Sequence, residues 1–206
     1  MAVRVLIIDD HESMCESLGN ALEETGRYVV AGTSPSARLA GLLCARLSPQ
    51  LVFMDVCTDG GASGLTAAER IIAEFPAVRV IMMSGFDEVT YAPRAKEIGA
   101  SAFVYKTRPL GCFIEAADAV VAGETRFTEA RAIPVLQGEA PLTGRELEIL
   151  RMRCRPMSNQ EIAQELGISQ RTVKFHLDNV KEKTGFSDIM ELLLWVSGNG
   201  WINPKF

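Results

Sequence analysis

Four apolar runs in the first half of the chain each end in polar residues suited to phosphate chemistry. These residues are an adjacent pair of carboxylates, a third carboxylate, a hydroxyl and an ammonium: Asp9 with Asp10, Asp55, Ser84 and Lys106. Carboxylate oxygens are ligands that hard divalent cations prefer, and a hydroxyl and an ammonium can hold an anion beside such a cation. These residue types therefore favour a site for a divalent cation and a phosphoryl group.

The elements that must position these residues are strands buried on both faces. The first 122 residues alternate such apolar runs with amphipathic segments, which predicts a parallel sheet with helices on both faces. At this size the five-stranded flavodoxin-like order is the usual solution, and the carboxyl ends of its strands gather at one edge. The expected strands lie near residues 3–8, 28–32, 51–55, 79–84 and 102–105. The expected helices are a first one ending at Gly26 and others near 36–47, 64–75, 88–98 and 109–122.

The rest of the chain has a different organisation. Residues 123–141 contain glycines and prolines with little periodicity, which predicts a linker with room for a short helix. Residues 142–202 have helical patterns only. Thr143 and Ser158 each begin an S/T-x-x-E capping box, which satisfies free backbone N–H groups at a helix start. Gly167 begins a tight turn between two of the expected helices, about 158–166 and 170–184. Gly185 ends the second of them at the position where a left-handed residue is needed.

The carboxylates, Ser84 and Lys106 at their strand ends resemble the receiver domain of bacterial response regulators. The stretches Leu142–Leu150, Ser158–Ala163 and Thr172–Leu177 resemble the LuxR-type helix-turn-helix. A receiver domain followed by a LuxR-type helix-turn-helix is the domain order of the NarL/FixJ family, and the resemblance covers nearly the whole chain. It implies a receiver domain at 1–122 and a DNA-binding domain at 142–206.

This resemblance implies that Asp55 is the phosphoacceptor. A physical argument supports this role. A carboxylate can attack a phosphoryl group only when the repulsion between their negative charges is neutralised. A Mg²⁺ ion held by Asp9, Asp10 and Asp55 would neutralise it. A further ligand in the family is a backbone carbonyl, here that of Cys57. Two departures concern loops: no proline follows Asp55 within residues 56–61, and Thr107 stands where many receivers have proline.

Three more residues of the first domain receive a role from the resemblance. Ser84 would donate a hydrogen bond to the phosphoryl oxygens, and Lys106 would pair with them. Phe103, three residues before Lys106, holds the aromatic switch position of the family and would turn inward as Ser84 moves toward the phosphate. An aromatic residue on a buried strand is also an ordinary core residue, so both interpretations of Phe103 stay open.

The helix expected at 170–184 has a buried face and a polar face. The buried face is formed by Val173, Leu177 and Val180. The expected DNA contacts are Arg171, Thr172, Lys174, Phe175 and Lys181. In a major groove, Lys174 can donate to guanine and Phe175 can touch a thymine methyl, while Arg171 and Thr172 can hold phosphates. The acid Asp178 on the same face would weaken phosphate attraction or accept from cytosine.

Composition and charge limit the classes of protein to which the chain can belong. The chain has 206 residues, no apolar stretch of about 20 residues that would span a membrane, and no signal region, so we expect a cytoplasmic protein. Its five cysteines are scattered and only two histidines occur, which argues against a zinc site or a disulfide framework. Residues 1–140 have a net charge of −6 and residues 141–206 of +1, so any basic footprint must be local.

The leading hypothesis is a transcription regulator and not an enzyme. A sensor histidine kinase would phosphorylate Asp55, and the protein would then bind promoter DNA as a homodimer. The resemblance implies that a last helix near 188–197 forms the dimer contact, although its apolar face could equally belong to the core. One rival is a Mg²⁺-dependent phosphohydrolase, but such enzymes commonly carry an acidic residue two positions after the nucleophile, where this chain has Cys57. The other rival is a regulator or interaction module that works without phosphorylation.

Overall fold

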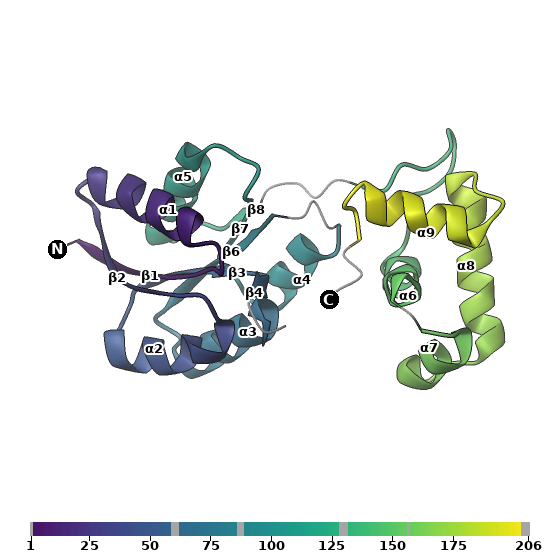
Figure 1. Ribbon diagram of the computed structural model, residues 1–206, viewed down its shortest axis with the longest axis horizontal. Helices are drawn as coiled ribbons and strands as arrows, with labels where there is room; N and C mark the ends of the chain where they lie inside the picture. Colours follow the sequence, from purple (N-terminus) through teal and green to yellow (C-terminus); the bar gives the residue numbers. More distant parts are fainter. Residues whose placement is uncertain (1, 59–61, 86–88, 128–131, 156, 203–206) are drawn as a thin grey trace. The chain divides into compact units, whose positions relative to one another are not determined.

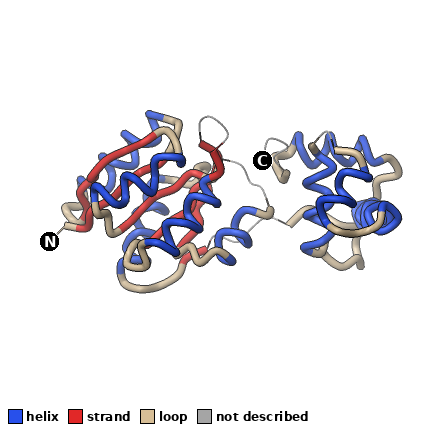
Figure 2. Tube along the Cα trace, turned by 90° about the horizontal axis from the view of Figure 1, so that it is seen from below, coloured by secondary structure: helices blue, strands red, loops and turns tan. Residues whose placement is uncertain are grey.

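The computed structural model describes residues 2–58, 62–85, 89–127, 132–155 and 157–202. The chain divides into two compact units. The first comprises Met1–Gly85 with Tyr91–Glu129, and the second comprises Phe86–Thr90 with Ala130–Phe206. The first unit contains the sheet, and the second is built from helices (Figures 1 and 2).

The first unit is organised around a parallel sheet with the strand order β2-β1-β3-β6-β7-β8. The apolar runs of the sequence form the middle strands, and β1 pairs with both β2 and β3. The flavodoxin-like parallel fold is therefore confirmed. The strands are β1 (Val3–Ile8), β2 (Tyr28–Ser34), β3 (Leu51–Asp55), β6 (Arg79–Ser84), β7 (Ala102–Tyr105) and β8 (Arg126–Phe127).

Helices cover both faces of this sheet, with α1 and α5 on one face and α2 and α3 on the other (Figure 1). Successive side chains of a strand point to opposite faces, so one set of alternate strand residues packs against α1 and α5. Phe53 of β3 meets Phe113 of α5 in this core, with ring centroids 6.4 Å apart. The helical elements are α1 (Glu12–Glu24), the 3₁₀ turn η1 (Ala37–Leu39), α2 (Ala40–Leu47), α3 (Gly64–Glu74), α4 (Tyr91–Glu97) and α5 (Leu110–Val121).

The sheet has six strands, and the prediction of five was wrong. The sixth, β8, lies inside the segment that the sequence indicated as a linker. It pairs in parallel with β7, and the backbone N–H of Arg126 donates to the carbonyl of Ser101 at 3.0 Å. Two residues are too short a stretch to show the alternation that identifies a strand, and the pairing is made by backbone atoms. Residues 132–143 form turns and irregular structure, and the short helix that the sequence allowed in the linker does not occur among them.

A second small sheet follows Asp55. Strands β4 (Cys57–Thr58) and β5 (Ala62–Ser63) pair antiparallel on either side of residues 59–61. The sequence indicated only a glycine-rich loop here, because two-residue strands carry no periodic signal.

The second unit contains the expected helices at nearly the expected positions. Both predicted capping boxes are present, at Thr143 and Ser158. Gly167 and Gly185 follow their helices with φ of 63° and 80°, in the left-handed region that favours glycine. The helices are α6 (Gly144–Cys154), α7 (Asn159–Leu166), α8 (Gln170–Thr184) and α9 (Ile189–Gly198).

Glu146 is a buried carboxylate that connects the start of α6 to the end of α8. It accepts from the Thr143 backbone N–H at 2.7 Å, the Thr143 hydroxyl at 3.0 Å and the Lys183 ammonium at 2.8 Å. Burial alone would raise the pKa of Glu146, but these donors favour the ionised form and hold the pKa below its usual value. The ionised carboxylate therefore stabilises the packing of α6 on α8.

Replacing Glu146 with glutamine should destabilise the second unit by about 1–3 kcal/mol at pH 7, because Lys183 loses a charged partner. The folded pKa is lowered, so this stabilisation is complete above the ordinary pKa of 4.5 and is lost as pH falls through the folded value. The chain's two tryptophans, Trp195 and Trp201, both lie in the second unit, so urea unfolding followed by tryptophan fluorescence measures this unit. A stability difference between wild type and Glu146→Gln that stays constant from pH 7 to pH 3 would contradict this account.

Candidate functional site

The carboxyl ends of four parallel strands form the candidate site. Asp9 follows β1, Asp55 ends β3, Ser84 ends β6, and Lys106 follows β7. Asp9, Asp55 and Ser84 are buried, with exposed fractions of 2%, 2% and 1%. Buried charged groups in proteins need a partner, and the sheet provides one by bringing all these strand ends to one edge.

The ammonium group of Lys106 lies between two buried carboxylates. Its Nζ atom is 2.7 Å from Asp9 Oδ2, 2.8 Å from Asp9 Oδ1 and 2.9 Å from Asp55 Oδ2. The Lys106 backbone N–H donates to the carbonyl of Ser84 at 2.7 Å, which ties the ends of β7 and β6 together. Burial alone would lower the pKa of Lys106, but the two carboxylates outweigh it and the pKa is raised.

Asp55 has an unusual environment for a carboxyl group. Burial raises its pKa to about 6, with a further contribution from nearby Asp9, while Lys106 and the Cys57 backbone N–H act in the opposite direction. The pKa of Asp55 is therefore raised mainly because burial outweighs the stabilisation that Lys106 gives to the ionised carboxylate. A divalent cation would favour the ionised carboxylate, since an opposite charge nearby stabilises the charged form.

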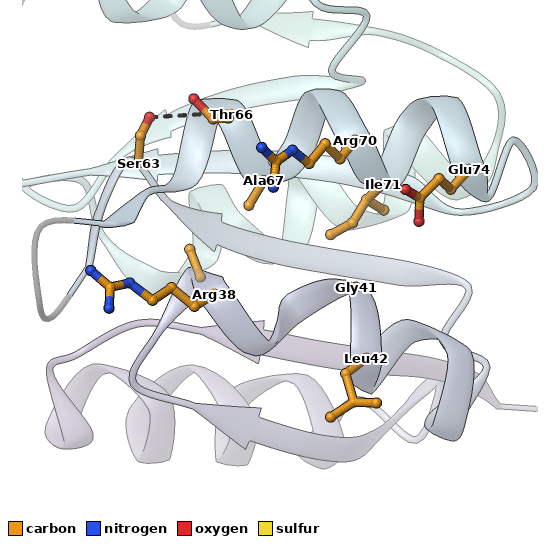
Figure 3. Close-up of a pocket in the computed structure, with 10 residues that line it drawn as sticks. Arg38, Gly41, Leu42, Ser63, Thr66, Ala67, Arg70, Ile71 and Glu74 are labelled. Carbon is orange, nitrogen blue, oxygen red and sulfur yellow. Dashed lines mark hydrogen bonds between the residues drawn. The ribbon is translucent and has the colours of Figure 1, made fainter.

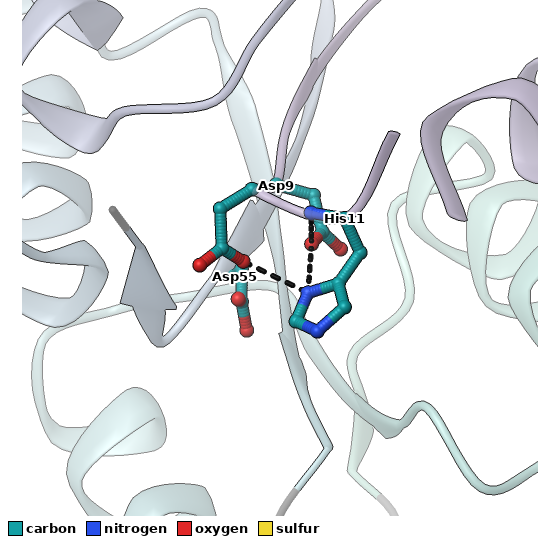
Figure 4. A group of neighbouring side chains, drawn as sticks. Asp9, His11 and Asp55 are labelled. Atoms are coloured by element: carbon teal, nitrogen blue, oxygen red, sulfur yellow. Dashed lines mark hydrogen bonds and ion pairs between the residues drawn. The ribbon is translucent and has the colours of Figure 1, made fainter. Parts of the chain in front are cut away.

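The donor set around Asp55 suits a hard divalent cation. Ligand atoms of Asp9, Asp10, His11 and Asp55 all lie within 4.8 Å of one another. Three of the four residues supply carboxylate oxygens, which are the ligands of Mg²⁺. Sequence reasoning missed His11, although it directly follows the Asp9-Asp10 pair. Its Nδ1 atom lies 2.8 Å from Asp10 Oδ1 and 3.2 Å from Asp9 Oδ1 (Figure 4).

The segment after Asp55 is held by backbone contacts. The Val56 N–H donates to the Met83 carbonyl, and the Gly64 N–H donates to the Val56 carbonyl, both at 2.9 Å. The half-buried Cys57 thiol lies 3.6 Å from the Tyr91 hydroxyl, so its side chain points to α4. A β-carbon on Gly64 would collide with the Asp55 carbonyl oxygen. Only glycine lets α3 start this close to the candidate phosphoacceptor.

Phe103 and Thr107 are the remaining predicted positions of this domain. Phe103 is completely buried and packs edge-on against Tyr105, with ring centroids 5.1 Å apart. It is therefore a core residue in this structure, and its switching role stays a prediction. No cis peptide bond occurs among the described residues, so the bond from Lys106 to Thr107 is trans.

A separate pocket of about 460 Å³ lies between the η1–α2 segment and α3 (Figure 3). Arg38 and Arg70 line it together with apolar groups such as Leu42 and Ile71. It contains none of the residues at the carboxyl ends of the central strands, so the chemistry of the carboxylate site does not depend on it.

In the second unit, α8 has the two faces that the sequence indicated. Val173, Leu177 and Val180 are buried, and Phe175 is 58% exposed. Ser169 caps the helix by accepting from the Thr172 N–H at 3.0 Å, and the hydroxyls of the two residues are 2.8 Å apart. Among the remaining predicted contacts, Arg171 and Lys174 are exposed.

One predicted contact of α8 has a partner within the helix. Lys181 forms an ion pair with Asp178 at 3.0 Å, so the acid on this face partly neutralises the base beside it. The exposed positive charge of α8 is therefore concentrated in its first two turns, where Arg171 and Lys174 lie.

Both units of the structure match known protein families. Residues 5–117 match the response regulator receiver domain, and residues 140–196 match bacterial regulatory proteins of the luxR family. Transcriptional regulatory protein MctR of Rhizobium johnstonii is 31% identical over 98% of this chain and 96% of its own length. Transcriptional regulatory protein LiaR of Bacillus subtilis is 30% identical over 98% of this chain and 100% of its own length.

Among solved structures, the response regulator RcsB of Salmonella typhimurium has the same fold. It superimposes with a TM-score of 0.62 at 21% identity, over 96% of this chain and 98% of that chain. The chain is a response regulator, with a receiver domain followed by a DNA-binding domain of the luxR family. None of its described helices has the length and apolar character needed to cross a membrane.

Substituting alanine for Gly64 should destabilise the first unit by about 1–3 kcal/mol, because the added methyl group meets a backbone carbonyl that no side-chain rotation can move. Gly41→Ala is the matched control, since a β-carbon there has open space within α2. It should stabilise the unit by about 0.5–1 kcal/mol through helix propensity. Urea unfolding followed by circular dichroism, with tryptophan fluorescence reporting the second unit separately, measures both. Equal effects of the two substitutions would show that the contact with Asp55 is unimportant.

Proposed function

We propose that a sensor histidine kinase phosphorylates this protein on Asp55 with Mg²⁺, and that phosphorylation controls dimerisation and sequence-specific DNA binding. The observation that supports the proposal best is the buried pair of Asp9 and Asp55 around Lys106. Residues 1–122 would receive the phosphoryl group and residues 142–206 would bind promoter DNA. In this role the protein regulates transcription in the cytoplasm and has no enzymatic turnover of its own.

Four residues would hold the Mg²⁺ ion: Asp9, Asp10, Asp55 and Cys57, the last through its backbone carbonyl. When bound, the ion supplies positive charge that offsets repulsion between the carboxylates and the incoming phosphoryl group. An ionised Asp55 oxygen would form a bond to phosphorus while the bond from phosphorus to the histidine nitrogen of the kinase breaks. The released imidazole keeps the electron pair of that bond and takes a proton from solvent.

Lys106 and Ser84 would bind the new phosphoryl group. Lys106 already contacts Asp55 Oδ2 at 2.9 Å, so its ammonium can pair with an oxygen attached to that carboxyl group. Ser84 lies at the end of the neighbouring strand, where its hydroxyl could donate to a second oxygen. Phe103, on the adjacent strand β7, would move with Ser84 as the receiver changes conformation.

The phosphohydrolase alternative has less support in the structure. It needs a general acid near Asp55, and the residue two positions later is Cys57, whose thiol points to Tyr91. A regulator that works without phosphorylation remains the second alternative, and the DNA measurement below separates it from the proposal.

DNA recognition is proposed for the N-terminal half of α8. Arg171, Thr172, Lys174 and Phe175 lie on its first two turns, and Lys181 lies farther along the helix. RcsB, which shares the fold, has been solved as two dimers bound to two parallel DNAs. A dimer of this chain would place two recognition helices on related half-sites about one helical turn apart, near 10–10.5 base pairs.

Asp55→Asn should abolish labelling by a small-molecule phosphodonor with Mg²⁺, because the amide is not a nucleophile. Asp10→Ala should slow labelling, since the cation loses a ligand. Glu24→Gln, on the exposed end of α1, is the matched control and should label like wild type. Phosphorylated wild type should bind its DNA more tightly by about 1–3 kcal/mol, the usual size of allosteric coupling. Wild type that labels at Asp55 yet binds DNA identically in both states would favour the phosphorylation-independent alternative.

Lys174→Ala should weaken binding to the preferred DNA site by about 1–3 kcal/mol if Lys174 contacts a base. The site is first selected from genomic DNA, and affinity is then measured on that site and on random DNA at equal salt. Lys96→Ala, an exposed lysine of α4, is the control for loss of one positive charge. An equal loss on both DNAs would make Lys174 a phosphate contact instead.

A further inference from the structure

Among the residues that the structure describes, His11 is the one non-carboxylate side chain of the candidate cation site, and neither the family resemblance nor the proposed function gives it a role. It ends the turn between β1 and α1 as the N-cap residue of α1, and its side chain is 68% exposed. Although most of the side chain is exposed, its Nδ1 atom faces the carboxylate oxygens (Figure 4). Its backbone N–H also donates to Asp9 Oδ1 at 3.0 Å, which fixes the start of the side chain close to the site.

The spacing of the ring nitrogen is that of a metal ligand. Ligands at right angles around an octahedral ion, each about 2.1 Å from it, are about 3 Å apart, and opposite ligands are about 4 Å apart. His11 Nδ1 is 2.8 Å from Asp10 Oδ1 and 3.2 Å from Asp9 Oδ1. With Asp55 included, all four ligand atoms lie within 4.8 Å of one another. After small movements of their side chains, all four residues could therefore coordinate the same ion.

A nitrogen ligand changes which ions the site prefers. Mg²⁺ favours oxygen ligands, whereas imidazole suits Ni²⁺, Zn²⁺ and similar borderline ions, which also bind more tightly than Mg²⁺ to mixed nitrogen and oxygen sites. We propose that His11 is an inner-sphere ligand that makes this receiver pocket a site for a divalent transition-metal ion in addition to Mg²⁺. The inference rests on the proposed cation site and adds a nitrogen ligand to it.

The experiment uses the full chain without a histidine tag, freed of metals by a chelator. Isothermal titration calorimetry measures the dissociation constants of Ni²⁺ and Mg²⁺ separately. His11→Ala should weaken Ni²⁺ binding by at least about tenfold, since even outer-sphere partners of metal ligands are worth 10–100-fold. Mg²⁺ binding should stay within about twofold of wild type, because its oxygen ligands are unchanged.

Two further variants separate ligation from other roles of the ring. His176→Ala removes the only other histidine of the chain, which lies on α8 against Phe175, and should leave Ni²⁺ binding unchanged. His11→Asn keeps a side chain that can hydrogen-bond to Asp10 but removes the imidazole nitrogen, and should lose Ni²⁺ affinity like His11→Ala. The same titration on protein with alkylated thiols should match wild type, because the proposed ligands include no thiol.

Three outcomes would overturn the proposal. Equal weakening of Ni²⁺ and Mg²⁺ in His11→Ala would mean that the ring only positions Asp10. Wild-type Ni²⁺ affinity in His11→Asn would mean that a hydrogen bond suffices, and Ni²⁺ binding that survives His11→Ala but not alkylation would place the ion on cysteine. None of these titrations needs a phosphodonor, so failure of the proposed phosphorylation would be seen separately, as absent Mg²⁺-dependent labelling of Asp55.

Discussion

Two carboxylates can be buried side by side in the receiver unit because the ammonium of Lys106 lies between them. Asp9 and Asp55 are each 2% exposed, and Lys106 Nζ is within 2.9 Å of both. Removing one partner from such a buried arrangement leaves an uncompensated charge, which typically costs 3–5 kcal/mol. The parallel strands, their register and the hydrogen bond from Lys106 to Ser84 are all needed to hold the three groups at one edge.

The same arrangement leaves the pocket with unbalanced negative charge. Asp10 adds a third carboxylate, and the raised pKa of Asp55 shows that Lys106 alone does not offset the burial and the neighbouring charge. In the proposed function, such a site would attract a cation and then accept an anionic phosphoryl group. The stability of the pocket and its proposed function would then depend on one set of charges, because the ammonium that contacts both carboxylates would also bind the phosphoryl group.

The helices of the second unit are stabilised by local contacts at their ends. Capping boxes at Thr143 and Ser158 satisfy the first N–H groups of α6 and α7, and left-handed glycines end α7 and α8. Glu146 has two functions, because it closes the first capping box and also pairs with Lys183 of α8. This carboxylate thereby connects the start of α6 to the last turn of α8.

The sequence alone determined the class of fold, the central strands and most helix boundaries, because long periodic patterns and capping motifs are local signals. It also predicted that Asp9, Asp10, Asp55, Ser84 and Lys106 share one edge of the sheet, since each lies beside the end of a recognisable apolar run. The tertiary structure determined the features that depend on contacts between distant segments of the chain. The β8 strand and the β4–β5 pair are two residues long and exist only through backbone pairing with distant segments. The need for glycine at residue 64 follows from the approach of α3 to the Asp55 carbonyl, and the position of the His11 ring follows from the turn between β1 and α1. Both depend on distances across the folded chain, which spacing along the sequence does not specify.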